Sequence, residues 1–242
     1  MTNIALEGLD EKTIDRDPIK QFQLWFNDAI AAGFPLPEAM TLATATPDGK
    51  PSARMVLLKQ VDQDGFVFFT NYQSAKAEQL DANPYAALVF YWPQLDRQVR
   101  VEGSVVRTSA EESRDYFKTR PRESQIGAWA SAQSQAIGSR DVLEQRAQES
   151  RDYFKTRPRE SQIGAWASAQ SQAISSREVL EQRAHELEAL YGDREIDCPE
   201  YWGGYRLKPE RIEFWKSRVG RLHDRILYER NATGWSITRL AP

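Results

Sequence analysis

The sequence predicts a mainly β protein with helices (β+α), in which antiparallel strands close into a barrel. Three observations favour this fold class. From Met40 onwards, apolar residues recur with the period of two that is typical of half-buried strands. Turn-forming residues separate these runs at short intervals, as at residues 47–50 and 62–65. Consecutive strands joined by tight turns pair antiparallel, and this many of them are expected to close on themselves.

The chain before these strands is predicted to be an arm and a helix. Residues 1–16 contain few large apolar side chains, so we expect a flexible N-terminal arm there and one domain over residues 17–242. The helix starts after Asp17, which can cap it, with Pro18 in the first helical position, and it ends at Gly33. Its apolar face has helical spacing and comprises Ile19, Phe22, Phe26, Ala29 and Ile30.

The predicted strands fall into two groups. They cover residues 40–46, 52–61, 66–70, 85–92 and 98–106, followed near the C-terminus by residues 204–207, 211–215, 221–228 and 235–240. A short helix over residues 74–80, with Ser74 as its cap, lies between the third and fourth strands. Pro93 marks the turn between the fourth and fifth strands.

The second strand contains Arg54-Met-Val-Leu-Leu-Lys59, an apolar run with a cation at each end. Alternation places Arg54, Val56 and Leu58 on one face and Met55, Leu57 and Lys59 on the other. Buried strands rarely begin and end in charge unless something pairs with it. The run is therefore either a strand whose ends hold an anionic ligand or a strand whose ends emerge into water.

A second cluster of cations lies in the C-terminal part of the chain. On a strand, Arg221, His223 and Arg225 share a face. Three cation-capable groups on one face repel each other unless an anion lies between them. The alternative is a basic, solvent-facing edge that discourages aggregation.

A third cluster lies on a predicted helix over residues 114–120, which ends at Pro121. Tyr116 and Arg120 are four residues apart and therefore share a face of this helix. Arg120 and Ser124 could grip a phosphate while Tyr116 supports a ring. The alternative is an ordinary surface helix with a proline stop.

Residues 112–148 are repeated almost unchanged as residues 149–185. The copies differ only at the pairs Gly138/Ser175, Asp141/Glu178 and Gln148/His185. The repeat is predicted to be helical, with a second helix starting near residue 139. Two copies are too few for a solenoid, so we interpret them as a tandem duplication within one domain. Its natural or engineered origin stays open.

The composition argues against several other classes of protein. The formal net charge is −3, whereas a general nucleic-acid binder usually carries a basic field. One cysteine, Cys198, and two histidines, His185 and His223, are too few for a disulfide framework or a His-based zinc site, so no metal is expected. No apolar run approaches the ~20 residues of a membrane span, and the N-terminus has no signal-peptide pattern, so a cytoplasmic location is expected.

Several short segments of the chain follow one another in order. They are Arg54-Met-Val-Leu-Leu-Lys59, Phe69-Thr-Asn71, Ser74-x-Lys76, Arg97-Gln-Val99, Arg120-Pro-Arg-x-Ser-Gln-Ile-Gly-Ala-Trp129, Tyr201-Trp-Gly-Gly-Tyr205, Glu213-Phe-Trp215, Arg221-Leu-His-Asp-Arg225 and Arg239-Leu-Ala-Pro242. Together they resemble the pyridoxamine 5′-phosphate oxidase family, from about Asp17 to the last residue. Only the extra repeat copy interrupts the resemblance.

The resemblance implies an FMN-binding split β-barrel that forms a homodimer, with FMN at the subunit interface. It implies oxidation of pyridoxamine 5′-phosphate or pyridoxine 5′-phosphate to pyridoxal 5′-phosphate, in which the flavin accepts a hydride and O2 reoxidises it to give H2O2. Several cations suit two phosphorylated ligands, because arginine can hold a phosphate with two donors. The implied partners are this small-molecule substrate and a second copy of the chain, with no nucleic acid and no membrane.

The resemblance also implies roles for individual residues. Those expected to hold FMN, some of them from the other subunit, are Arg54, Met55, Val56, Leu57, Leu58, Lys59, Phe69, Thr70, Lys76, Gln98, Gln133, Ser134, Trp215 and Arg225. Those expected at the substrate phosphate are Lys59, Tyr116, Arg120 and Ser124. Arg221 and His223 are expected at the substrate ring as catalytic residues. The second repeat copy offers competing residues, namely Tyr153, Arg157, Ser161, Gln170 and Ser171.

The chain departs from the family pattern in three places. Ala75 stands where relatives often carry an arginine, and residues 1–6 lack the Arg and Tyr that some relatives place over the substrate. The repeat is the third departure. Because the strand ending near residue 106 leads directly into the first copy, we expect that copy to supply the first helix and the second copy to supply the second helix, with residues 139–157 as extra helix. The alternative function is an FMN- or pyridoxal-phosphate-binding split-barrel protein with another substrate, or with activity impaired by the duplication.

Overall fold

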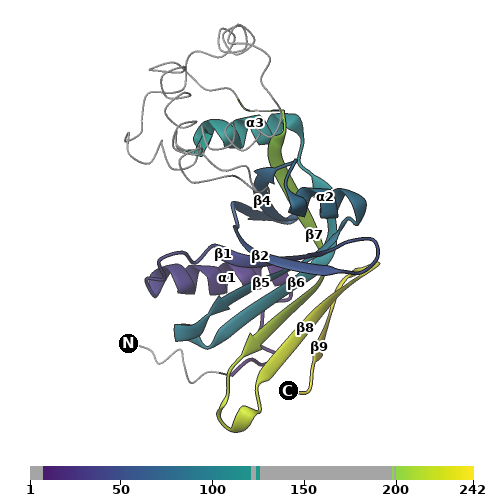
Figure 1. The fold of residues 1–242 in the computed structure, drawn as a ribbon. Helices are drawn as coiled ribbons and strands as arrows, with labels where there is room; N and C mark the ends of the chain where they lie inside the picture. Colours follow the sequence, from purple (N-terminus) through teal and green to yellow (C-terminus); the bar gives the residue numbers. More distant parts are fainter. Residues whose placement is uncertain (1–7, 121–123, 126–197, 199) are drawn as a thin grey trace, which may run out of the picture. The chain divides into compact units, whose positions relative to one another are not determined.

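The computed structural model describes residues 8–120, 124–125, 198 and 200–242 (Figure 1). Its helices are α1 (Pro18–Ala31), α2 (Ala75–Ala82) and α3 (Ala110–Thr119), with short 3₁₀ turns η1 (Pro93–Leu95) and η2 (Val219–Arg221). Its strands are β1 (Ala39–Ala45), β2 (Pro51–Leu57), β3 (Gln60–Asp62), β4 (Gly65–Asn71), β5 (Tyr85–Trp92), β6 (Arg97–Arg107), β7 (Trp202–Lys216), β8 (Asp224–Asn231) and β9 (Gly234–Arg239). Among the described helices, none is long and apolar enough to cross a membrane.

The chain divides into two compact units, and each is described by itself. The first unit comprises residues 1–68, 79–106 and 205–242. The second unit comprises residues 69–78 and 107–204. The predicted division into an arm over residues 1–16 and a single domain over residues 17–242 stays a prediction.

The strands form one sheet in the order β2-β1-β5-β6-β7-β4-β3, extended by β8 on β7 and by β9 on β8. The pairs β1–β2, β1–β5, β3–β4, β5–β6, β7–β8 and β8–β9 are all antiparallel. The antiparallel fold class predicted from the sequence is therefore confirmed. The purely consecutive pairing is wrong, because β1 pairs with β5 and β4 lies next to β7.

The short link between β2 and β3 shows how the sheet curls. The two strands are consecutive in the chain but stand at opposite ends of the strand order. The N–H of Leu58 donates to the carbonyl of Glu38, just before β1, at 2.9 Å, and the N–H of Lys59 donates to Val67 of β4 at 2.8 Å. These two adjacent amides therefore bond next to β1 and to β4, which lie near opposite ends of the strand order. The sheet must curl to bring these strands together. The single strand predicted over residues 52–61 is wrong for the same reason, since it breaks at this link.

One long strand replaces two of the predicted ones. Residues 204–207 and 211–215 both belong to β7, which continues through Pro209. Proline lacks the N–H that a strand ladder uses, and strands rarely contain it away from an edge. The carbonyl of Pro209 is still bonded, because it accepts the Nε–H of Arg230 at 3.1 Å.

Helix α1 packs on the strands of the first unit (Figure 1). As predicted, the Asp17 carboxylate caps it, accepting the N–H of Ile19 at 2.9 Å. Phe22 is fully buried, and its ring centroid lies 4.9 Å from that of Phe66 and 4.8 Å from that of Phe90. The predicted apolar face is wrong at its end, because Ile30 is 52% exposed.

The residue missing from that predicted face is Trp25, which is 4% exposed. Its ring packs edge-on against Phe214 of β7, with centroids 5.2 Å apart. Trp25 lies three positions after Phe22, and residues at this spacing share a helix face. The buried stripe is therefore rotated by about one position from the predicted one.

The described part of the N-terminal segment contacts the C-terminal strands of the first unit. The N–H of Leu9 donates to Asp224 at 3.1 Å, and the hydroxyl of Tyr228 donates to the carbonyl of Asp15 at 2.6 Å. Ile14 is buried with 7% of its surface exposed. Residues 8–15 are thus held in place by hydrogen bonds to β8. Residues 1–6, which lack the Arg and Tyr of some relatives, lie outside the described residues.

Candidate functional site

The residues expected to bind ligands are found in both units. In the first unit the structure describes Arg54, Met55, Val56, Leu57, Leu58, Lys59, Gln98, Trp215, Arg221, His223 and Arg225. In the second unit it describes Phe69, Thr70, Lys76, Tyr116, Arg120 and Ser124. The remaining predicted residues lie outside the described parts of the chain, and they are Gln133, Ser134, Tyr153, Arg157, Ser161, Gln170 and Ser171.

Arg54 lies in the middle of a polar cluster on β2. The predicted alternation of the strand is confirmed, because Arg54 is half-buried whereas its neighbour Met55 is 63% exposed. The guanidinium donates to Thr44 Oγ1 at 2.6 Å and to Gln79 Oε1 at 3.1 Å. Burial lowers the pKa of Arg54, but an arginine stays charged at any ordinary pH. A half-buried cation whose side-chain partners here are neutral is suited to hold an anion.

Gln79 is a member of this cluster that the sequence reasoning missed. Its carbonyl oxygen accepts from Arg54 and from the hydroxyl of Thr44, the latter at 2.6 Å, while its amide donates to Ser52 Oγ at 3.0 Å. A single side chain thus links β1, β2 and the C-terminal half of α2. The sequence indicates this role of Gln79 only weakly, because a glutamine three positions after Lys76 looks like any exposed helix residue.

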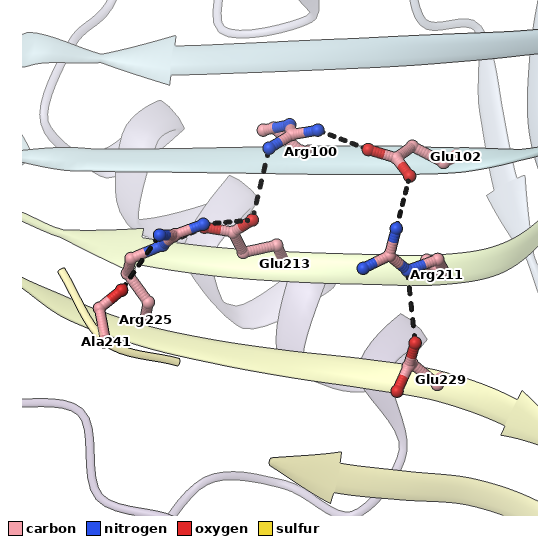
Figure 2. A network of polar contacts seen from close by, with 7 residues as sticks. All are labelled: Arg100, Glu102, Arg211, Glu213, Arg225, Glu229 and Ala241. Atoms are coloured by element: carbon pink, nitrogen blue, oxygen red, sulfur yellow. Dashed lines mark hydrogen bonds and ion pairs between the residues drawn. The ribbon is translucent and has the colours of Figure 1, made fainter. Parts of the chain in front are cut away.

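Trp215 and Arg225 are direct neighbours across the antiparallel pair of β7 and β8. The Trp215 ring also lies against the ring of His223, with centroids 4.7 Å apart. Arg225 donates through Nε to Glu213 Oε1 at 2.7 Å and through Nη2 to Glu213 Oε2 at 3.2 Å (Figure 2). This pair of hydrogen bonds raises the pKa of the Arg225 guanidinium. Gln98 lies half-buried on β6.

The predicted strand face of three cations is wrong. Residues 219–221 form the turn η2, and β8 begins only at Asp224. Arg221 has a left-handed backbone with φ of 63°, follows Gly220 at φ of 74°, and is exposed. The alternation on which the prediction rested therefore does not extend to Arg221. His223 and Arg225 remain adjacent to Trp215, whereas Arg221 stands in the turn.

His223 has a defined hydrogen-bonding state. The backbone N–H of Arg218 donates to its Nδ1 at 3.1 Å. An imidazole nitrogen that accepts carries no proton, so the neutral ring holds its proton on Nε2. The Nε2–H is therefore the group that His223 can offer to a ligand.

The second unit contains a stack of three aromatic rings. The Tyr116 ring lies 3.9 Å from that of Phe69, and the Phe69 ring lies 5.1 Å from that of Trp202, with nearly parallel planes in both pairs. The Arg120 guanidinium lies over the Trp202 ring at 4.3 Å. Tyr116 and Arg120 thus both lie near Trp202, but the predicted helix over residues 114–120 is wrong at its end, because α3 ends at Thr119 and Arg120 follows it with an extended backbone. Burial raises the pKa of Tyr116, against an opposing effect of Arg120, so its hydroxyl stays protonated.

The stack depends on two glycines next to Trp202. A Cβ on Gly203 would lie 2.3 Å from the Tyr72 hydroxyl, and a Cβ on Gly204 would lie 2.8 Å from the Phe69 ring. Any side chain at either position would thus push Tyr72 or Phe69 away from β7. Trp202 and these glycines were present in the quoted segment Tyr201–Tyr205, but the sequence reasoning gave them no role.

Gln125 fixes the end of α3, where Arg120 stands. It is 3% exposed, and its amide donates to the carbonyls of Phe117 at 2.8 Å and Arg120 at 2.9 Å. Both carbonyls lie at the C-terminal end of the helix, where the regular hydrogen bonds of the helix run out, and the Phe117 carbonyl also accepts the N–H of Arg120 at 3.1 Å. The neighbouring Ser124 is half-buried. Gln125 was also missed, because nothing in a lone glutamine indicates a helix end.

Lys76 is a buried cation at the start of α2. It is 7% exposed, and its ammonium donates to Thr70 Oγ1 at 3.2 Å and to Ser74 Oγ at 3.3 Å. Ser74 precedes the helix as predicted, and its hydroxyl donates to the carbonyl of Asn71 at 2.7 Å. An ammonium at a buried position is poorly screened by water, so it interacts strongly with an anion that reaches it.

Comparison with known proteins shows the family. Residues 26–151 match the family model described as pyridoxamine 5′-phosphate oxidase. The chain is also 50% identical over 242 residues to the pyridoxine/pyridoxamine 5′-phosphate oxidase of Paraburkholderia xenovorans, covering 99% of this chain and 96% of that protein. The chain belongs to the pyridoxamine 5′-phosphate oxidase family. The oxidase of Rubrobacter xylanophilus is likewise 50% identical, over 97% of this chain and 91% of the relative.

The C-terminal strands and the solved structures agree with this membership. Residues 202–242 match the model described as the pyridoxine 5′-phosphate oxidase C-terminal dimerisation region. A crystal structure of PhzG from Burkholderia lata, in complex with tetrahydrophenazine-1-carboxylic acid, has a TM-score of 0.77 and 26% identity, covering 98% of this chain and all of that one. An FMN-binding, pyridoxamine 5′-phosphate oxidase-related protein from Nostoc punctiforme, at 20% identity and a TM-score of 0.53, shares the fold.

Proposed function

We propose that the protein oxidises pyridoxamine 5′-phosphate or pyridoxine 5′-phosphate to pyridoxal 5′-phosphate, with FMN as the hydride acceptor, O2 as the oxidant and H2O2 as the product. The observation that carries this proposal is the 50% identity to oxidases of this name over nearly the whole chain. The chemistry of the residues supports it. Lys76 and Arg54 are cations at buried or half-buried positions, and Trp215 offers a flat ring, so the chain provides groups suited to a phosphate and to a flavin ring.

The proposed FMN ligands are the residues that the family resemblance indicated. They are Arg54 to Lys59, Phe69, Thr70, Lys76, Gln98, Trp215 and Arg225, together with Gln133 and Ser134 or their second-copy equivalents Gln170 and Ser171. When bound, FMN supplies the redox chemistry. The chain holds and orients the ligands, and its charged groups balance their phosphates.

The proposed substrate residues are Lys59, Tyr116, Arg120 and Ser124 at the phosphate, with Arg221 and His223 at the ring. The Nε2–H of His223 can donate to an oxygen or nitrogen of the substrate, since its Nδ1 already accepts from Arg218. The second repeat copy offers Tyr153, Arg157 and Ser161 instead. The ring stack around Tyr116 supports the first copy, because α3 follows β6 directly and already contacts Trp202.

A homodimer with FMN at the subunit interface is part of this proposal. The match of residues 202–242 to a dimerisation region supports it. An alternative substrate is the second candidate, because the PhzG structure shows that a relative at 26% identity binds a phenazine compound. Ala75 and the N-terminal residues without Arg or Tyr are the features of this chain that keep this candidate open.

Turnover of the two phosphates by the FMN-supplemented protein tests the proposal. We expect pyridoxal 5′-phosphate and H2O2 to form in equal amounts from pyridoxine 5′-phosphate and O2. The repeat provides a matched pair of variants, Arg120→Met and Arg157→Met. Losing a charge-assisted phosphate contact weakens binding by roughly 30-fold, so Arg120→Met should raise KM for the substrate by about that factor while Arg157→Met leaves it unchanged.

Each outcome of this assay is informative. Formation of H2O2 from tetrahydrophenazine-1-carboxylic acid, with none from either B6 phosphate, would favour the second candidate. A raised KM in Arg157→Met with a normal KM in Arg120→Met would assign the substrate phosphate to the second copy.

A further inference from the structure

Glu213 is a buried carboxylate between two arginines of the first unit. It lies on β7 with 8% of its surface exposed. Its Oε1 accepts from Arg225 Nε at 2.7 Å, and its Oε2 accepts from Arg225 Nη2 at 3.2 Å and from Arg100 Nη1 at 3.3 Å (Figure 2). Both carboxylate oxygens are therefore engaged, and Glu213 connects β6, β7 and β8. The family resemblance gave Glu213 no role.

The strand register explains why Glu213 holds Arg225. Trp215 is paired with Arg225 across β7 and β8, and Glu213 lies two residues before Trp215 on the same side of β7. The Arg225 side chain therefore runs diagonally across the pair, at the distance that long side chains can bridge. Its third nitrogen, Nη1, donates to the carbonyl of Ala241 at 3.0 Å. All three nitrogens of the guanidinium are thus held within the first unit, which fixes both its plane and its position beside Trp215.

We propose that Glu213 is the positioning residue of Arg225: by gripping Nε and Nη2 it fixes the guanidinium beside Trp215 in the orientation that receives FMN. The inference rests on the proposed function, in which Arg225 and Trp215 contact FMN. Arg225 would otherwise sample many rotamers, and ordering it on binding would weaken affinity.

Two effects of Glu213 oppose each other, and their sizes decide the sign of the prediction. Its negative charge partly neutralises Arg225, which by itself weakens the binding of an anion. The Arg225 side chain is 28% exposed, so water screens the repulsion between the Glu213 charge and a bound anion. Loss of the carboxylate weakens the pair of charge-assisted hydrogen bonds at 2.7 and 3.2 Å and removes the negative charge between Arg100 and Arg225, which then repel each other. Positioning is therefore the larger effect.

The test is the dissociation constant of FMN, measured by quenching of flavin fluorescence in the full-length protein. Glu213→Gln should weaken FMN binding about tenfold, because one of the two charge-assisted bonds to Arg225 is lost. The matched control is Glu229→Gln on β8, whose carboxylate forms an ion pair with Arg211 at 3.3 Å and is 50% exposed. This control should bind FMN as the wild type does.

A double mutant separates positioning from a general structural role. If Glu213 acts through Arg225, then Glu213→Gln should add no further loss of FMN affinity to Arg225→Gln. Glu213→Asp keeps the charge but shortens the reach, so it serves as a second variant if the Gln substitution prevents folding, and it too should weaken binding.

Three results would overturn the inference. The first is a wild type that binds FMN together with a Glu213→Gln variant that binds it equally or more tightly. The second is a loss that is the same in the Arg225→Gln background as in the wild type. The third is a wild type that binds no FMN at all, which would end the proposed function and this inference together and is recognised before any variant is compared.

Discussion

Replacing Lys76 with methionine is expected to weaken FMN binding by about 30-fold or more. Lys76 is 7% exposed, and its ammonium lies 3.2 Å from Thr70 Oγ1 and 3.3 Å from Ser74 Oγ. A charge-assisted bond to a phosphate contributes roughly 2–3 kcal/mol, which corresponds to that factor. Methionine has a similar length and no charge, so the space is still filled. Flavin fluorescence quenching measures the affinity.

The apoprotein provides the control for this prediction. Methionine keeps the length of the side chain, so the apo Lys76→Met variant should remain folded, which cooperative unfolding in urea checks. Lys208→Met, at an exposed position of β7, should leave FMN affinity unchanged. Equal FMN affinity in the Lys76 and Lys208 variants would show that Lys76 does not contact the cofactor.

Phe22→Ala is expected to lower the free energy of unfolding by about 4 kcal/mol. Phe22 is fully buried in α1, and its ring contacts Phe66, Phe90 and Trp92 at centroid distances of 4.9, 4.8 and 6.1 Å. The substitution removes this side chain from the centre of the core of the first unit and leaves a cavity. For a chain of this size the loss corresponds to a fall in Tm of roughly 10 °C.

Leu24→Ala on the same helix is the matched control. Leu24 is 54% exposed, so its removal should change the free energy of unfolding by less than about 1 kcal/mol. Urea unfolding followed by tryptophan fluorescence measures both. Coincident unfolding curves for the two variants would contradict the assignment of Phe22 to the core.

Local sequence patterns predicted most of the helices and strands, but they did not predict which strands far apart in the sequence pair. The cap at Asp17 and the alternation around Arg54 follow from neighbouring residues, and the structure contains both. The pairing of β1 with β5 and the place of β4 beside β7 depend on contacts between distant parts of the chain. Only the assembled sheet decides between such partners, because many strands offer similar apolar faces.

In the candidate site, too, local spacing predicted some features, whereas features that depend on long-range contacts were not predicted. Helical spacing predicted that Tyr116 and Arg120 lie close together, and both side chains lie near Trp202 although α3 ends at Thr119. The position of Arg221 was not, because a left-handed turn at Gly220 ends the alternation that the prediction assumed. The role of Glu213 was also hidden, since its partner Arg225 is set by the register of two strands.

The repeat limits what spacing alone can predict. Both copies carry the same Tyr, Arg and Ser, so local sequence cannot choose between them. The structure describes the first helix of the first copy and its contact with Phe69. The second helix predicted from residue 139 and the arrangement of residues 139–157 lie outside the described residues.

The most direct test of the proposed oxidase activity is the absorbance of the FMN-loaded protein when pyridoxine 5′-phosphate is added without oxygen. The account predicts that the band of oxidised flavin bleaches on addition and returns when O2 is admitted, with one pyridoxal 5′-phosphate formed per flavin. A protein that holds FMN tightly, and whose flavin band stays unchanged with both pyridoxine and pyridoxamine 5′-phosphate, would contradict it.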